Sequence, residues 1–113
     1  MSLLTNVEDK RHFIVPAGKE FVLANPDLSE EERTLRSLDD LSEAINLIDP
    51  ETFQQHVNAE KNDFANWVQN VFGEEKLAED LRHYPTPLRM MVSIEKFLRQ
   101  SNHSTSIPVQ SGK

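Results

Sequence analysis

Residues 56–84 read HVNAEKNDFANWVQNVFGEEKLAEDLRHY, and this stretch decides the fold. Five apolar residues recur in it at positions i, i+3, i+4, i+7 and i+8, which lie on one face of a helix: Phe64, Trp67, Val68, Val71 and Phe72. Gly73 suits the end of that helix, because glycine readily takes the left-handed conformation common at helix C-termini. A second helix with Leu77, Ala78 and Leu81 facing inward follows, and Pro85 stops it. The stretch therefore predicts two antiparallel helices joined by a glycine, with Trp67 in the core.

Helix start signals mark three further helices around this pair. Ser37 is a suitable N-cap for the run SLDDLSEAINLI, whose apolar residues recur at helical spacing. Asp49-Pro50 begins the short run DPETFQQHV, and Thr86-Pro87 begins the last helix, PLRMMVSIEKFLRQ. Proline suits the first position of a helix, so both pairs predict a helix start.

The segment ahead of the helices, HFIVPAGKEFVLA, has the alternation of β-structure. Phe13 and Val15 are apolar positions two apart, as are Phe21 and Leu23, and residues 16–19 between them are turn formers. The pattern predicts a short β-hairpin. Because two strands alone are marginally stable, we expect this hairpin to pack on the helices.

Together these elements predict a mainly α fold, at the margin of α+β, in which a small N-terminal β-hairpin packs on a bundle of about five short helices. A chain of 113 residues has room for one hydrophobic core. We expect a flexible N-terminus over residues 1–10 and a single helical domain over residues 11–100. Residues 101–113 are Ser-rich and have no apolar pattern, which predicts a disordered C-terminal tail.

Composition narrows the classes of function. The net charge of -7 would repel the phosphates of nucleic acid, so we expect no nucleic-acid partner. There is no cysteine, which excludes disulfides and thiolate metal sites. No apolar run has signal-peptide or transmembrane length, so we expect a cytoplasmic protein with no membrane partner. The charge is unevenly placed: residues 1–81 carry 18 acids against 7 bases, whereas residues 82–113 carry five bases against Glu95 alone.

The central part of the chain resembles a known family. The residues that carry the resemblance are Phe53-x-x-His56-Val57-Asn58, Asn62-Asp63-Phe64-x-x-Trp67-Val68, Phe72-Gly73 and Leu77-Ala78, preceded by Ser37-Leu38-Asp39-Asp40-Leu41. This pattern is similar to a small prokaryotic family, frequent in archaea, that is called domain of unknown function 5752. The resemblance covers about residues 13–82. It implies a fold and no assigned activity, and residues 25–35 resemble an insertion relative to the family.

His56, Asn62 and Asp63 are the polar residues in this region that packing does not explain. In one interpretation they form a small ligand-binding, metal-binding or enzymatic site, with His56 as base or ligand and Asp63 as its orienting carboxylate. In the other, His56 is a hydrogen-bonded residue at a helix end, and Asp63 caps the helix that carries Trp67. No nucleophile or second ligand lies at a suitable spacing, so we favour the structural interpretation and expect no metal, no cofactor and no enzymatic activity.

The last helix is the candidate contact surface, because its apolar residues cover an arc of roughly 220°, whereas a helix that faces only its own core needs little over 100°. We expect a central stripe to hold it to the domain: Met91, Ile94 and Leu98. Met90 and Phe97 flank the stripe on one side, and Leu88 and Val92 flank it on the other. The candidate interface consists of Met90, Ile94, Phe97, Arg89 and Lys96. A helix buried at the centre of the bundle would explain the same pattern.

The sequence thus predicts a non-enzymatic protein–protein interaction module that associates with itself or joins a larger assembly through its last helix. The alternative is the small ligand- or metal-binding or enzymatic domain centred on His56 and Asp63. The partner in the first case is a protein, and a homo-oligomer fits it.

Overall fold

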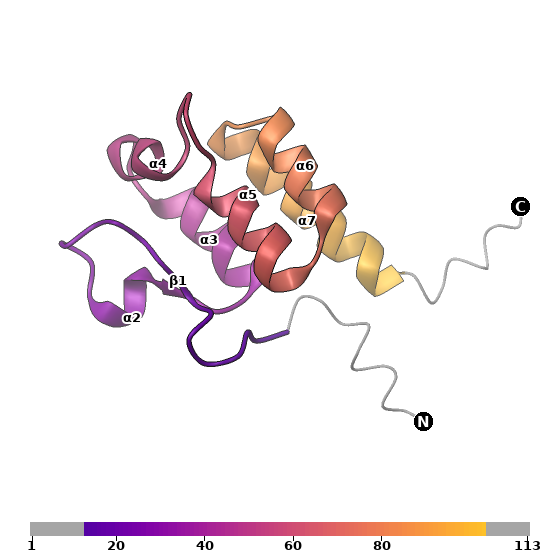
Figure 1. Cartoon of the computed structure of the whole chain (residues 1–113), viewed down its shortest axis with the longest axis horizontal. Helices are drawn as coiled ribbons and strands as arrows, with labels where there is room; N and C mark the ends of the chain where they lie inside the picture. The colour runs from indigo at the N-terminus through magenta and orange to yellow at the C-terminus, as the bar shows by residue number, and fades with distance from the viewer. Residues whose placement is uncertain (1–12, 104–113) are drawn as a thin grey trace, which may run out of the picture.

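The computed structural model describes residues 13–103, which are mainly α-helical with a two-stranded antiparallel sheet (Figure 1). The predicted fold class is confirmed. The elements in chain order are β1 (Phe21–Val22), α2 (Glu30–Arg33), β2 (Thr34–Leu35), α3 (Leu38–Leu47), α4 (Pro50–His56), α5 (Asp63–Trp67), the π-helix η2 (Val68–Phe72), α6 (Glu75–His83) and α7 (Pro87–His103).

Several helix ends follow directly from local sequence. The Ser37 side chain accepts a hydrogen bond from the backbone N–H of Asp40 at 3.0 Å, which caps α3 as predicted. Ser29 and Glu32 form a reciprocal capping box at the start of α2. Gly73 has φ 70° and ends η2 in the left-handed conformation, as its position predicts.

The small sheet pairs different strands from those predicted. β1 pairs with β2 in the register Phe21↔Leu35 and Val22↔Thr34, and not with residues 13–15. The predicted turn does form, since the N–H of Lys19 donates to the carbonyl of Pro16 at 3.0 Å. Val15 bonds instead beyond the end of β2, where its N–H donates to the carbonyl of Arg36 at 2.9 Å, and both Val15 and Leu35 are buried in the core.

The helix that carries Trp67 begins as an α-helix and ends as a π-helix. Residues five apart stand over one another in such a wide turn. The rings of Trp67 and Phe72, five positions apart, meet edge to face with centroids 5.0 Å apart. The widened turn therefore keeps both aromatic rings on the same side of the helix, where one continuous apolar face was predicted.

The helix α7 is longer than predicted. It runs to His103, so the first three residues of the predicted tail are helical, because no helix breaker occurs before Pro108. The predictions for residues 1–10 and 104–113 lie outside the described residues.

The core lies between α3, α5, α6 and α7, and α7 packs against both α3 and α6. The largest fully buried side chains are Phe64, Leu38, Leu41, Leu77, Leu81, Met90, Ile94, Leu98 and Val68. On α7 the buried stripe is therefore Met90, Ile94 and Leu98, each 0% exposed. Met91 and Phe97 lie half-buried on its two flanks.

The placement of Met90 and Ile94 in the predicted interface is therefore wrong. Both side chains are fully enclosed within their own chain and have no surface to offer a partner. The apolar arc of this helix is so broad that the sequence does not determine which part of it faces the core. Contacts with α3 and α6 determine the rotation of α7 about its own axis.

Candidate functional site

His56 lies at the end of α4, is only 6% exposed, and has a partner for each ring nitrogen. Its Nδ1 lies 3.0 Å from Oδ2 of Asp63, and its Nε2 accepts the backbone N–H of Ala24 at 2.9 Å. A backbone N–H can only donate, so Nε2 carries no proton in this arrangement. We infer that Nδ1 carries the ring proton and donates a hydrogen bond to Oδ2 of Asp63.

Through these hydrogen bonds His56 connects three segments of the chain. It joins the end of α4 to the start of α5 through Asp63, and to the N-terminal segment through Ala24. Both nitrogens are engaged, so neither is free to bind a metal ion or to take a proton from a substrate. The contacts favour the structural interpretation of the His56–Asp63 pair. Asp63 also forms an ion pair with Lys61, whose Nζ lies 3.1 Å from Oδ2.

Asn62, and not Asp63, is the N-cap of α5. Its Oδ1 accepts the backbone N–H of Ala65 at 3.0 Å, whereas Asp63 is the first residue of the helix. The Asn62 side chain also donates from Nδ2 to the carbonyl of Leu81 at 3.1 Å, which ties α5 to α6. The predicted capping role of Asp63 was therefore wrong by one position, because a side chain bonded to His56 is unavailable to the backbone.

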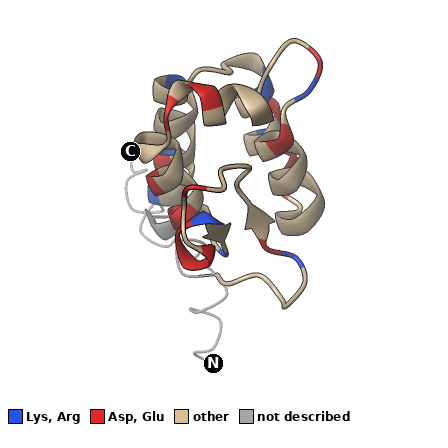
Figure 2. Ribbon diagram, turned by 90° about the vertical axis from the view of Figure 1, so that its left-hand side faces the viewer, with Lys and Arg blue, Asp and Glu red and all other residues tan. Residues whose placement is uncertain are grey.

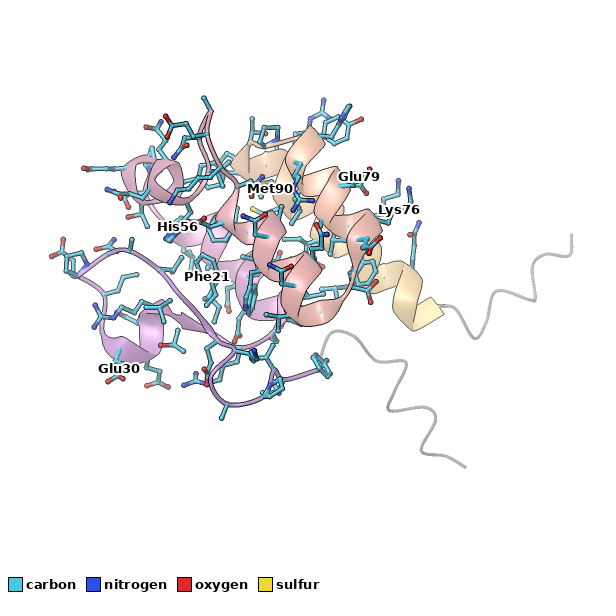
Figure 3. All side chains as sticks on the ribbon, in the orientation of Figure 1. Phe21, Glu30, His56, Lys76, Glu79 and Met90 are labelled. Carbon is cyan, nitrogen blue, oxygen red and sulfur yellow. The ribbon has the colours of Figure 1, made fainter. Side chains whose placement is uncertain are left out.

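The N-terminal segment completes this region with an aromatic contact that sequence reasoning missed. The Phe21 ring lies beside His56 (Figure 3), with ring centroids 4.9 Å apart. It also contacts the rings of Phe64 and Trp67, with centroids 5.0 Å and 5.6 Å apart. The Trp67 indole N–H donates to the carbonyl of Lys19 at 2.7 Å. Alternation around Phe21 predicted a strand, but no local pattern identifies the partners of the Phe21 ring. His56 and Trp67 thus hold the N-terminal segment onto the helices.

The part of the chain that the structure describes contains no cluster of metal-binding side chains. No group of three or more His, Asp or Glu side chains there is arranged to hold a metal ion. Within the same residues, no helix combines the length and apolar character needed to cross a membrane.

The surface of α7 that points away from the core carries two aliphatic residues and three cations. We call this set the outward face of α7: Leu88, Arg89, Val92, Lys96 and Arg99. Leu88 is 68% exposed and Val92 is 52% exposed, and they stand one helical turn apart. The Arg89 guanidinium lies 5.2 Å from the centre of the Tyr84 ring. Among residues 13–100, whose side chains the structure describes, no ion pair involves any of the three cations. Arg89 and Lys96 of the predicted interface are thus at the surface, and Phe97 is half-buried.

A groove of about 730 Å³ lies between the N-terminal segment and α3, and sequence reasoning did not identify it. Its apolar lining comes from Leu23, Leu28, Leu35, Ala44, Leu47 and Ile48. Its charged lining comes from Asp27, Glu31, Glu32, Asp40, Glu43, Asp49 and the single base Arg36. We call this site the acidic groove. Figure 2 looks onto the side of the molecule that carries α2, where red acidic residues dominate that helix.

Two acids of the acidic groove have defined local partners. The hydrogen bond with the Thr52 side chain holds the pKa of the Asp49 carboxyl below its ordinary value, so Asp49 is ionised at neutral pH. Asp40 accepts the backbone N–H of Arg36 at 2.9 Å through Oδ2. No run of sequence marks this groove, because its acids come from separate segments that meet only in the fold.

Comparison with known proteins finds no match to this chain among family models, curated proteins or solved structures. The resemblance to domain of unknown function 5752 therefore stays a prediction from the residues that carry it.

Proposed function

We propose that this domain is a non-enzymatic protein–protein interaction module that associates with itself through the outward face of α7. The observation that carries the proposal is the exposure of Leu88 and Val92 on one helix face, among three cations that have no ion-pair partner in the described chain. An apolar centre with a charged rim is the usual composition of a protein contact surface.

The energy of such a contact comes mainly from the two aliphatic side chains. Full burial of a Leu or Val side chain contributes roughly 1.5–3 kcal/mol relative to exposure. Association also costs an estimated 4–15 kcal/mol in lost translational and rotational freedom, so a surface this small supports weak binding, on the order of micromolar to millimolar. We therefore propose a reversible, concentration-dependent association.

His56 and Asp63 have a structural role in this proposal. His56 and Asp63 are the pair that most resembles a catalytic arrangement, and both are engaged in bonds that hold the fold together. We therefore assign the contact to α7 and a structural role to these two residues.

The test is the double variant Leu88→Gln/Val92→Gln, measured by light scattering during size-exclusion chromatography over a range of concentrations. We expect the parent to show a mass that rises with concentration and the variant to stay at the monomer mass. Its melting temperature should match that of the parent, because both side chains are exposed.

The matched control is Ile14→Gln, which replaces an aliphatic residue of similar exposure, 59%, outside α7. This control should associate like the parent. A parent that stays monomeric at every concentration, or a double variant that associates like the control, would remove the support for the proposed function.

A further inference from the structure

The outward face of α7 needs a complementary surface, and the acidic groove of this same chain has the matching properties. The groove combines an apolar lining with six carboxylates and one guanidinium. The outward face of α7 combines Leu88 and Val92 with three cations and no acid. Leu47, one of the apolar residues that line the groove, is 74% exposed and is therefore open to contact by another molecule.

A single copy cannot bring these two surfaces together. The Ser42 hydroxyl donates to Oε2 of Glu95 at 3.1 Å, which fixes α7 against one side of α3. Asp40, Glu43 and Leu47 of the groove stand roughly 100–160° around α3 from Ser42, at about 100° per residue. The groove therefore lies on the side of α3 away from α7, and the outward face of α7 points away from the domain.

We propose that the acidic groove receives the outward face of α7 from a second copy of this chain. This inference rests on the proposed function and identifies the other half of its contact. Leu88 and Val92 lie against the apolar lining, which includes the exposed Leu47, while the cations of α7 face the carboxylates of the groove. Opposite charges in such a contact raise the association rate and select the orientation, and salt screens them.

The contact is heterologous, because it joins two different surfaces of identical chains. Each copy then offers one free groove and one free helix face, so association continues into rings or open chains and does not stop at a two-fold dimer. The expected mass distribution therefore extends beyond the dimer at high protein concentration.

Charge reversal tests the inference by sedimentation equilibrium at low salt. One variant, Glu31→Lys/Glu43→Lys, reverses the charge of two residues in the groove. The other, Lys96→Glu/Arg99→Glu, reverses the charge of two residues on the outward face of α7. Each should weaken association about tenfold or more relative to the parent, because like charges then face one another. A chain that carries all four substitutions has opposite charges at both surfaces again, and it should recover most of the parent's association.

The matched control for the groove variant is Glu60→Lys/Glu79→Lys, which changes the net charge by the same amount and in the same direction at exposed positions outside the groove. It should associate like the parent. If the reversed groove does not fold by circular dichroism, the neutral pair Glu31→Gln/Glu43→Gln takes its place, with a smaller loss expected.

The outcomes separate this inference from the proposed function. If reversing the helix weakens association while reversing the groove leaves it at the control's level, the groove is not the partner surface, and the outward face of α7 meets another surface. If the four-fold variant stays as weak as the two double variants, the pairing of groove and helix is wrong. If the parent itself is monomeric, both proposals fall.

Discussion

Trp67→Ala will lower the free energy of unfolding by about 3–5 kcal/mol, a large share of the total stability of a domain this size. The side chain is 7% exposed and contacts the rings of Phe21 and Phe72. Its indole N–H also donates to the carbonyl of Lys19. Alanine removes the ring and this bond together, so the N-terminal segment loses two of its contacts with α5. Urea unfolding followed by circular dichroism measures the loss.

Trp67→Phe is the matched control for this change. It keeps an aromatic ring in the core and removes the bond to Lys19, so the expected loss is only about 1–2 kcal/mol. An alanine variant that unfolds at the same urea concentration as the parent would show that Trp67 does not hold the N-terminal segment to the helices.

Met90→Gln is expected to cost about 3–4 kcal/mol, because glutamine places an amide without a partner in the core and removes apolar contact. Met90 is 0% exposed and lies in the buried stripe of α7 (Figure 3). Thermal unfolding of the variant should show a clearly lower melting temperature. This variant tests which stripe of α7 the core uses.

The comparison for Met90→Gln is Leu88→Gln on the same helix, where the parent side chain is 68% exposed. The melting temperature should change little at this position, since surface substitutions are usually within about 0.5 kcal/mol. Equal losses at the two positions would mean that α7 is rotated from the orientation described above.

Local signals in the sequence predicted much of the fold. Ser37 caps α3 and Gly73 ends η2 because each interaction depends on residues only a few positions apart. The burial of Trp67 followed from five apolar residues on one helix face. The mainly α class follows from the same kind of repeat.

What the sequence did not predict depends on contacts between distant segments. The residues paired between β1 and β2 are 14 and 12 positions apart, and the donor to His56 Nε2 is Ala24, 32 positions away. Contacts between residues so far apart produce no periodic pattern in the sequence. The candidate site was predicted in part: His56 and Asp63 do meet, but Asn62 takes the cap. The acidic groove gathers its acids from α2, α3 and the loops beside them, so only the fold brings them together.

The central claim is that the outward face of α7 in one copy meets the acidic groove of another, and intermolecular paramagnetic relaxation tests it most directly. The chain has no cysteine, so Gln100→Cys provides a single attachment site for a nitroxide on an exposed position of α7. Labelled protein is mixed with unlabelled ¹⁵N protein, and only contacts between copies broaden the observed amide signals.

We predict broadening at amides that line the groove, such as those of Leu28, Glu31 and Ala44, and its loss when salt is raised. Broadening confined to the α7 amides of the ¹⁵N copies would show that two helices meet face to face. No broadening at any concentration would contradict self-association itself.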